Sequence, residues 1–197
     1  METDTTRDLF RNKYRISSAR LRTWDYASEG MYFVTICTKD RENYFEEIVE
    51  SPIVNGRLDL LETRCIASLR ATEIGKIAEL EWIKTLELRP DMNIEIGEFI
   101  VMPNHFHGII IFGDNQFNGI NGDTNANKFG PQSKNLASIL RGYKAAVTTN
   151  ARKYNIPFAW QPRFHDHIIR SDDEFKRISN YIVDNPANWQ RDKFYTS

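Results

Sequence analysis

Residues 93–112, NIEIGEFIVMPNHFHGIIIF, are the stretch that decides the fold. Apolar and polar residues alternate over 93–101 before the run becomes fully apolar, which is typical of a strand. Residues 105–112 form a second run rich in apolar and aromatic residues. Because the corner at 102–104 is short and contains Pro and Asn, we predict that the two strands pair as an antiparallel hairpin.

Strands and helices alternate on both sides of this hairpin. The sequence MYFVTICT at 31–38 is β-branched and aromatic, which indicates a buried strand. Apolar residues recur near a 3.6 period over 68–88 and 134–154, which predicts two helices. In the second helix we expect a buried stripe that includes Tyr143. The sequence RFHDHII at 163–169 predicts the last strand.

A third helix follows, and its start and end are both marked. Ser171 and Glu174 form a capping box that opens it, and Pro186 is expected to end it at about Asn185. Between the first strand and the first helix, the sequence NGR at 55–57 favours the turn of a further hairpin.

This order of elements predicts the fold class. It is an α+β, ferredoxin-like βαββαβ arrangement: an antiparallel sheet with two helices on one face, plus a C-terminal helix that carries a tyrosine. We expect residues 1–28 to form a basic N-terminal arm and residues 29–197 to form a single domain. The Gly- and Asn-rich residues 113–131 are expected to be a flexible insertion in that domain.

Composition narrows the function classes. The 197 residues are 41% hydrophobic, as in a globular protein, and no apolar run is long enough to cross a membrane. The N-terminus lacks the apolar region of a secretory signal, and Cys37 and Cys65 cannot build a disulfide framework, so we expect a cytoplasmic protein. The net charge of −1 argues against a uniformly basic protein, yet residues 128–170 carry eight Lys or Arg against one acid, which predicts an electropositive face.

Two His-x-His pairs are candidates for chemistry. Residues two apart on a strand share a face, so His105 and His107 can hold one divalent metal ion, although they can also be ordinary surface histidines. His165 and His167 have the same spacing. The corner and the apolar run favour the first pair as ligands, and the second pair is expected to contact phosphate or to orient the site.

The third helix adds a nucleophile and a ligand. Tyr181 and Asn185 lie one turn apart, away from the expected buried stripe. The amide oxygen of Asn185 can complete a mixed N/O shell that suits Mg²⁺ or Mn²⁺, and a tyrosine hydroxyl beside that metal can attack phosphorus. The alternatives are that Tyr181 is only a surface tyrosine of an amphipathic helix, or that Tyr143 is the nucleophile.

The combination of VMPNHFHG at 101–108, WQPRFHDHIIR at 160–170 and YIVDNPANW at 181–189 resembles the HUH single-tyrosine transposases, specifically the REP-associated, IS200-like type. The resemblance covers most of the chain and implies that His105 and His107 are the metal-binding histidine pair. It also implies that Tyr181 is the nucleophile and that Asn185 joins the metal shell. Members of that family cut single-stranded DNA near hairpins, keep the 5′ end on the tyrosine and free a 3′-hydroxyl.

The expected partner is therefore single-stranded or hairpin DNA. The sequence does not decide between a monomer and a homodimer. Trp24, Tyr26 and Trp189 are candidates to stack on bases. Residues assigned to DNA binding are Arg20, Arg22, Arg141, Lys144, Arg152, Lys153, Arg163, Arg170 and Trp160. The competing functions are a catalytically silent hairpin-binding protein, a replication-initiator-like nickase, and a metallophosphoesterase that uses water.

Overall fold

The computed structural model describes residues 24–50, 67–118 and 133–196. A four-stranded antiparallel sheet with strand order β4-β5-β1-β6 forms the centre. Its strands are β1 (Gly30–Cys37), β4 (Ile94–Met102), β5 (His105–Phe112) and β6 (His165–Ile169). The strand order and the crossovers between strands confirm the predicted α+β, ferredoxin-like fold.

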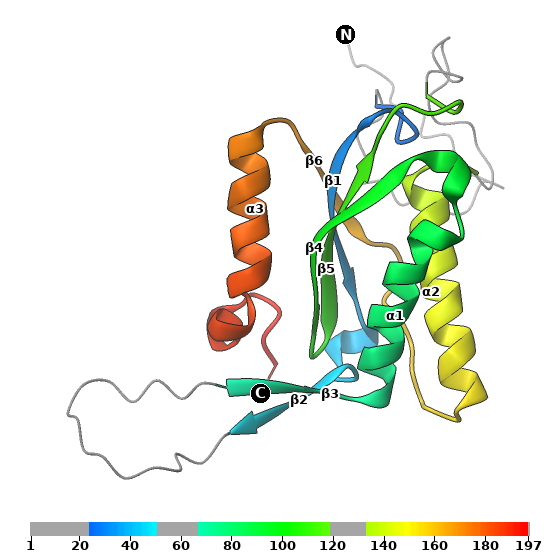
Figure 1. The fold of residues 1–197 in the computed structure, drawn as a ribbon. Coiled ribbons are helices and arrows are strands. Elements are labelled where there is room, and N and C mark those ends of the chain that lie inside the picture. Colours follow the sequence, from blue (N-terminus) through cyan, green and yellow to red (C-terminus); the bar gives the residue numbers. More distant parts are fainter. Residues whose placement is uncertain (1–23, 51–66, 119–132, 197) are drawn as a thin grey trace, which may run out of the picture.

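The helices form one layer on each side of this sheet (Figure 1). On one face α1 and α2 lie side by side, and α3 lies alone on the other face. The helices are α1 (Glu73–Glu87), α2 (Leu136–Lys153) and α3 (Asp172–Asp184), and short 3₁₀ turns are η1 (Lys39–Arg41), η2 (Pro90–Met92) and η3 (Pro186–Arg191).

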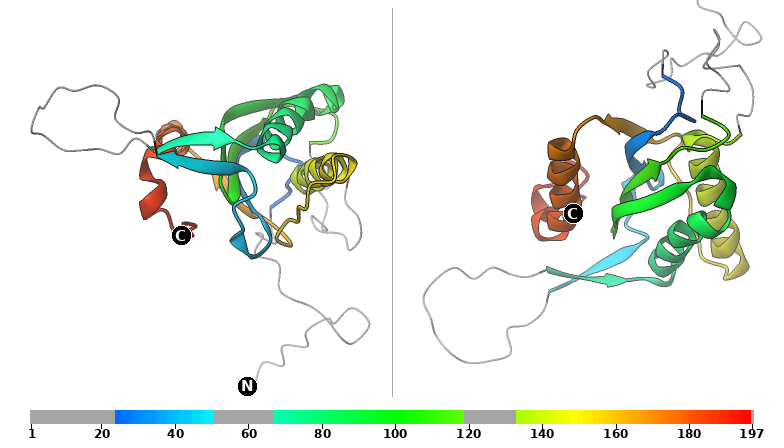
Figure 2. Two further views of the ribbon diagram at one scale, coloured as in Figure 1. Left: turned by 90° about the horizontal axis from the view of Figure 1, so that it is seen from below. Right: turned by 45° about the horizontal axis from the view of Figure 1, so that its top comes forward.

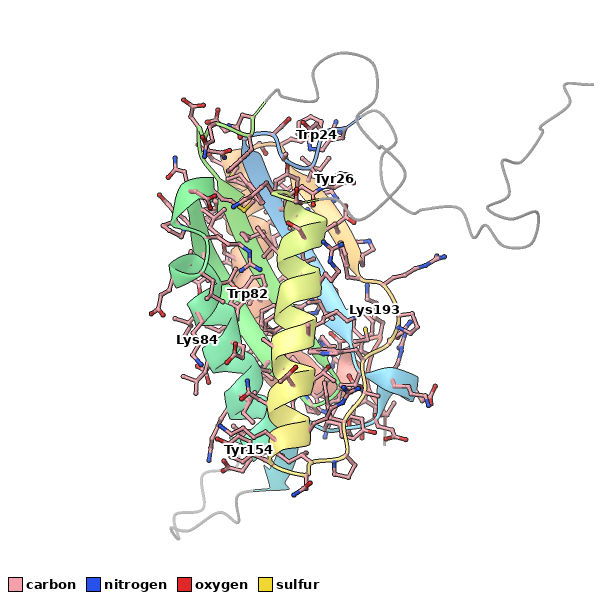
Figure 3. The ribbon with its side chains drawn as sticks, turned by 90° about the vertical axis from the view of Figure 1, so that its right-hand side faces the viewer. Trp24, Tyr26, Trp82, Lys84, Tyr154 and Lys193 are labelled. Carbon is pink, nitrogen blue, oxygen red and sulfur yellow. The ribbon has the colours of Figure 1, made fainter. Side chains whose placement is uncertain are left out.

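The larger part of the core fills the space between the sheet and the helix pair. Trp82 of α1 is fully buried there (Figure 3), with its ring 4.7 Å from Phe106 and 5.3 Å from Tyr143. Phe106, Ile110 and their neighbours two apart on β5 face this side because strand side chains alternate. Tyr143 is 2% exposed, so its prediction as a core residue is confirmed.

The predicted hairpin and the third helix are also confirmed. In the hairpin Met102 pairs with His105 across the corner. Ser171 caps α3 by accepting a hydrogen bond from the Glu174 amide, and Asn185 is the C-cap. The predicted capping box forms only in this half, because the Glu174 carboxylate accepts from the Arg170 amide and not from that of Ser171. The apolar stripe of α3 packs on the opposite face of the sheet, where Ile178 and Ile182 contact Ile109.

The first helix starts later than the sequence predicts. Thr72 is its N-cap and accepts a hydrogen bond from the Gly75 amide, so the helix begins at Glu73 and not at 68. The preceding residues form β3 (Ala67–Ala71), which pairs antiparallel with β2 (Glu46–Glu50). This ribbon runs from the start of α1 toward η3 (Figure 2). The turn expected at 55–57 lies outside the described residues.

The N-terminal arm and the insertion are described only in part. Arg20 and Arg22 lie outside the described residues, as do residues 119–132 of the insertion. Trp24 and Tyr26, near one end of α2 (Figure 3), pack against the core: the Trp24 indole donates to the Tyr32 hydroxyl at 3.0 Å, and Tyr26 is 5% exposed. A buried Tyr26 ring cannot stack on a base in this conformation. None of the helices in the described ranges is long and apolar enough to span a membrane.

The close approach of α1 to the chain before β2 can be tested at Gly75. A Cβ there would lie 2.1 Å from the Phe45 carbonyl oxygen, so Gly75→Ala should lower the free energy of unfolding by about 1–3 kcal/mol, although alanine favours helices. At Gly142 in α2 the nearest atom is the flexible guanidinium of Arg89. Gly142→Ala should therefore be neutral or stabilising in urea denaturation, and equal effects of the two variants would contradict this account.

Candidate functional site

The first histidine pair lies on the sheet face that α3 covers. His105 and His107 begin β5, and their ring centroids are 4.5 Å apart. Their exposed fractions are 0% and 1%, so they are not surface histidines. The prediction that they share a face is confirmed, because Phe106 between them points into the opposite core.

Each ring is oriented by a hydrogen bond at its Nδ1 atom. His105 Nδ1 lies 3.0 Å from the Asn104 amide oxygen, and His107 Nδ1 lies 2.9 Å from the Thr35 hydroxyl. The Nε2 atom of His105 is buried and has no hydrogen-bond partner among the described residues. A buried nitrogen without a partner is costly in a folded protein, but it is the arrangement that a metal ligand requires.

Tyr181 reaches this pair from α3. Its hydroxyl lies 3.2 Å from His107 Nε2 and donates to Asp192 Oδ2 at 3.3 Å. The side chain is 40% exposed, so a substrate can approach it. Burial, followed by the nearby Asp192 carboxylate, raises the pKa of Tyr181 to about 12, which keeps the hydroxyl protonated at neutral pH.

Asp192 is a site residue that sequence reasoning missed. It follows η3, and one of its carboxylate oxygens lies with one nitrogen each of His105 and His107 in a group whose atoms are all within 4.8 Å. This His-His-Asp group can hold a metal ion. Asp192 stands on a segment without regular periodicity, so no spacing rule links it to the histidines.

Asn185, the predicted third ligand, lies in the same place. It is 2% exposed, and its amide nitrogen donates to Asp192 Oδ2 at 3.2 Å. Its amide oxygen is buried without a hydrogen-bond partner among the described residues. The site thus holds two oxygen donors, one predicted and one not, and the ligand role of Asn185 stays a prediction.

Electrostatics keep the imidazoles neutral. Burial lowers the pKa of His105 to about 3, with smaller contributions from Arg41 and Lys193, and burial also lowers the pKa of His107 well below its usual value. Neutral imidazole is the form that binds metal. Two neutral imidazoles and a carboxylate form a mixed N/O donor set that fits a divalent cation.

A cleft of about 660 Å³ opens from His107 and Tyr181 toward solvent. The second pair, His165 and His167, lines this cleft, and neither has a hydrogen bond to the first pair within the described ranges. His167 Nε2 instead lies 2.8 Å from Glu174. The role of His165 and His167 therefore remains a prediction. Basic side chains that also line the cleft are Arg177, Arg191 and Lys193.

Most of the predicted DNA-binding residues lie elsewhere. The helix α2, which carries Arg141, Lys144, Arg152 and Lys153, packs on the other face of the sheet (Figure 1). The Lys144 ammonium donates to the carbonyl oxygens of Gln161 and Arg163, at 2.7 and 3.0 Å, so it holds the segment before β6.

Trp160 and Trp189, which were predicted to contact DNA, pack against other residues of the protein. Trp160 donates to the Lys144 carbonyl at 3.1 Å and packs against Phe45 and Phe158. Trp189 is 1% exposed, so it cannot stack on a base in this conformation. Arg163 and Arg170 are exposed at the two ends of β6, and their role in DNA binding stays a prediction.

Comparison with known proteins shows one clear relative in sequence. A protein of uncharacterised function from Haemophilus influenzae (strain ATCC 51907 / DSM 11121 / KW20 / Rd) is 32% identical over 188 residues, which cover 90% of this chain and 92% of that protein. The chain therefore belongs to the same family as that protein. No family model matches the chain.

Two solved structures of transposases resemble the chain more distantly. One is a REP-associated tyrosine transposase bound to a REP hairpin, with 21% identity, a TM-score of 0.48, and coverage of 88% of this chain and 74% of that chain. The other is a transposase candidate from Deinococcus radiodurans R1, with 14% identity, a TM-score of 0.37, and coverage of 85% and 97%. At these values neither likeness is evidence of a shared activity.

The buried neutral histidines predict a pH dependence of stability. The folded pKa of His105 lies below the unfolded value near 6.5, so the unfolded chain binds more protons as pH falls. In EDTA, lowering the pH from 7.5 to 5.5 should cost the wild-type protein about 1.4 kcal/mol through His105 alone. In urea denaturation, the free energy of unfolding of His105→Gln should therefore fall by about 1.4 kcal/mol less than that of the wild type over this pH range. An unchanged pH dependence in the variant would contradict a buried neutral His105.

Proposed function

This chain and the Haemophilus influenzae protein belong to one family. We propose that this chain is a metal-dependent endonuclease and strand transferase. It acts on single-stranded DNA at hairpins and uses Tyr181 as its nucleophile. One observation carries the proposal: the Tyr181 hydroxyl lies 3.2 Å from His107 Nε2, on the same sheet face as the His105, His107 and Asp192 donor group. The sequence resemblance to the HUH transposases adds the DNA substrate.

His105, His107 and an oxygen from Asp192 or Asn185 would hold the cation, which we propose to be Mg²⁺ or Mn²⁺. When bound, it would polarise the scissile phosphate and offset the charge that develops in the transition state. The unpartnered His105 Nε2 supports this assignment, because a buried acceptor without a partner is otherwise unfavourable.

The protein's own residues perform the transfer. The Tyr181 oxygen attacks phosphorus, the bond from phosphorus to the 3′ oxygen breaks, and a proton restores the 3′-hydroxyl. The 5′ end of the DNA stays on Tyr181 as a phosphotyrosine. Because His107 Nε2 would be occupied by the cation, the acceptor for the Tyr181 proton is the Asp192 carboxylate, whose Oδ2 accepts the Tyr181 hydrogen bond at 3.3 Å. Attack by the freed hydroxyl on the phosphotyrosine reverses the step and rejoins DNA.

The competing functions need different parts of this site. A silent hairpin-binding protein does not need a tyrosine hydroxyl within hydrogen-bond distance of the histidine pair. A phosphoesterase that uses water needs the donor group but not Tyr181. A replication-initiator-like nickase shares the chemistry and differs only in its DNA target. Covalent capture of DNA therefore separates the first two from the proposal.

Replacing the nucleophile gives the direct test. Wild-type protein, incubated with labelled hairpin-bearing single-stranded DNA and Mn²⁺ or Mg²⁺, should form a DNA–protein adduct that survives SDS. Tyr181→Phe removes only the attacking oxygen, so it should abolish the adduct and retain DNA binding within about twofold in a gel-shift assay. Tyr195→Phe is the matched control, since Tyr195 is also 40% exposed and follows η3, and it should retain adduct formation.

The outcomes distinguish the competing functions. Cleavage that persists in Tyr181→Phe without an adduct would indicate a water nucleophile. DNA binding without cleavage by the wild type in either metal would favour the silent binding protein. His105→Ala should lose adduct formation together with metal dependence, and an active His105→Ala protein would argue against the metal site.

The cleft predicts which basic residues contact the DNA strand near the site. Replacing Arg177, Arg191 and Lys193 together by Gln should weaken binding and reduce the slope of log K against log salt, by about 0.7 for each lost phosphate contact. The control with the same change in charge replaces Arg141, Arg152 and Lys153 on α2, across the sheet. An equal loss in both triple variants would show that the cleft is not the preferred path.

A further inference from the structure

Asn104 lies at the corner of the hairpin, directly before His105, and its side chain is fully buried. Its amide nitrogen lies 2.8 Å from the Phe194 carbonyl oxygen and 3.1 Å from the Arg41 carbonyl oxygen. Its amide oxygen lies 3.0 Å from His105 Nδ1. Because carbonyl oxygens only accept hydrogen bonds, the amide nitrogen must face them, and the orientation of the amide is fixed.

This orientation determines the form of the His105 ring. The Asn104 oxygen can only accept, so the neutral imidazole carries its proton on Nδ1 and donates it to Asn104. The lone pair is therefore on Nε2, the buried atom that has no hydrogen-bond partner in the described part of the chain. Only this tautomer can bind a metal ion through Nε2 without losing a proton.

The same side chain also reaches the segment that supplies Asp192. Phe194 accepts the Asn104 hydrogen bond through its carbonyl oxygen and donates through its own amide to Asp192 Oδ1 at 2.7 Å. The Phe194 ring lies against His105, with centroids 4.6 Å apart. One residue, Phe194, thus connects the buried amide of Asn104 to the carboxylate of the donor group.

We propose that Asn104 is a positioning residue that assembles the metal site from two distant parts of the chain. It fixes the tautomer of His105 through its amide oxygen, and it holds the Asp192 segment against the histidine pair through its amide nitrogen. This proposal rests on the metal site of the proposed function, but its effect on the ring can be measured without metal.

Two variants separate the two contacts. Asn104→Ala removes both, so His105 should no longer have its proton confined to Nδ1, and the affinity for Mn²⁺ should fall by about tenfold or more. Asn104→Asp keeps an oxygen for His105 but replaces the donor to Phe194. It should therefore keep the Nδ1-protonated ring and still lose Mn²⁺ affinity. If Asn104→Ala does not fold, Asn104→Asp alone tests the link to the Asp192 segment.

The measurements use the full chain. Long-range ¹H–¹⁵N NMR spectra of the metal-free protein report the tautomer of each imidazole, and His105→Gln identifies the His105 signals. Titration calorimetry with Mn²⁺ gives the affinity. A folded Asn104→Ala protein with the wild-type tautomer and affinity would overturn the proposal, as would a folded Asn104→Asp protein with wild-type affinity. A wild-type protein that binds no Mn²⁺ would reject the metal site instead, while the NMR comparison would still test the contact with His105.

Thr38 provides the matched control. It is fully buried at the same corner, and its hydroxyl lies 2.9 Å from the backbone carbonyl oxygen of Asn104 and 2.8 Å from that of Glu42. Thr38→Val should lower the melting temperature and leave the His105 tautomer and the Mn²⁺ affinity unchanged. If it reduced the affinity as much as Asn104→Ala, general loosening of the corner would explain both results and the positioning role would be rejected.

Discussion

The alternation of side chains along β5 is the constraint on which the rest of the structure depends. Phe106 and Ile110 enter the core under α1 and α2, so His105 and His107 must face α3. A shift of one residue in the register would exchange these two sets and place the imidazoles among the aromatic core residues. The tight packing of Phe106 against Trp82 therefore fixes the face on which the chemistry takes place.

Those parts of the fold and of the site that follow a regular period could be predicted from the sequence. The hairpin, the α2 stripe, the Ser171 cap and the shared helix face of Tyr181 and Asn185 all follow from spacings of two, three or four residues. The predicted start of α1 at residue 68 was wrong, because the apolar pattern of the helix continues backwards through β3. Only the capping contact of Thr72 marks the boundary between the two elements. A short strand and a helical turn with similar composition look alike in sequence.

The remainder of the site could not be predicted, because it depends on contacts between distant segments. Asp192 and Phe194 belong to an irregular segment after η3 that is folded back on the hairpin corner by Asn104. The basic residues of the cleft were missed for a related reason. Net charge along the chain favoured residues 128–170, but four of the eight basic residues in that stretch lie on α2, which packs on the opposite layer. Charge counted along a sequence does not identify the face on which it is displayed.

The helices on the two faces of the sheet bury different numbers of apolar side chains, and this difference determines which helix opens more easily. The α1–α2 face covers a large aromatic cluster, whereas α3 buries only Ile178 and Ile182 of its own, mainly against Ile109 and Ile169 of the sheet. Local opening costs least where few apolar side chains are buried. Amide hydrogen exchange should accordingly be faster in the helix that bears Tyr181 than in the pair behind the sheet. The imidazoles of His105 and His107 thus stand on the rigid sheet, whereas the phenol of Tyr181 stands on the helix that opens more easily.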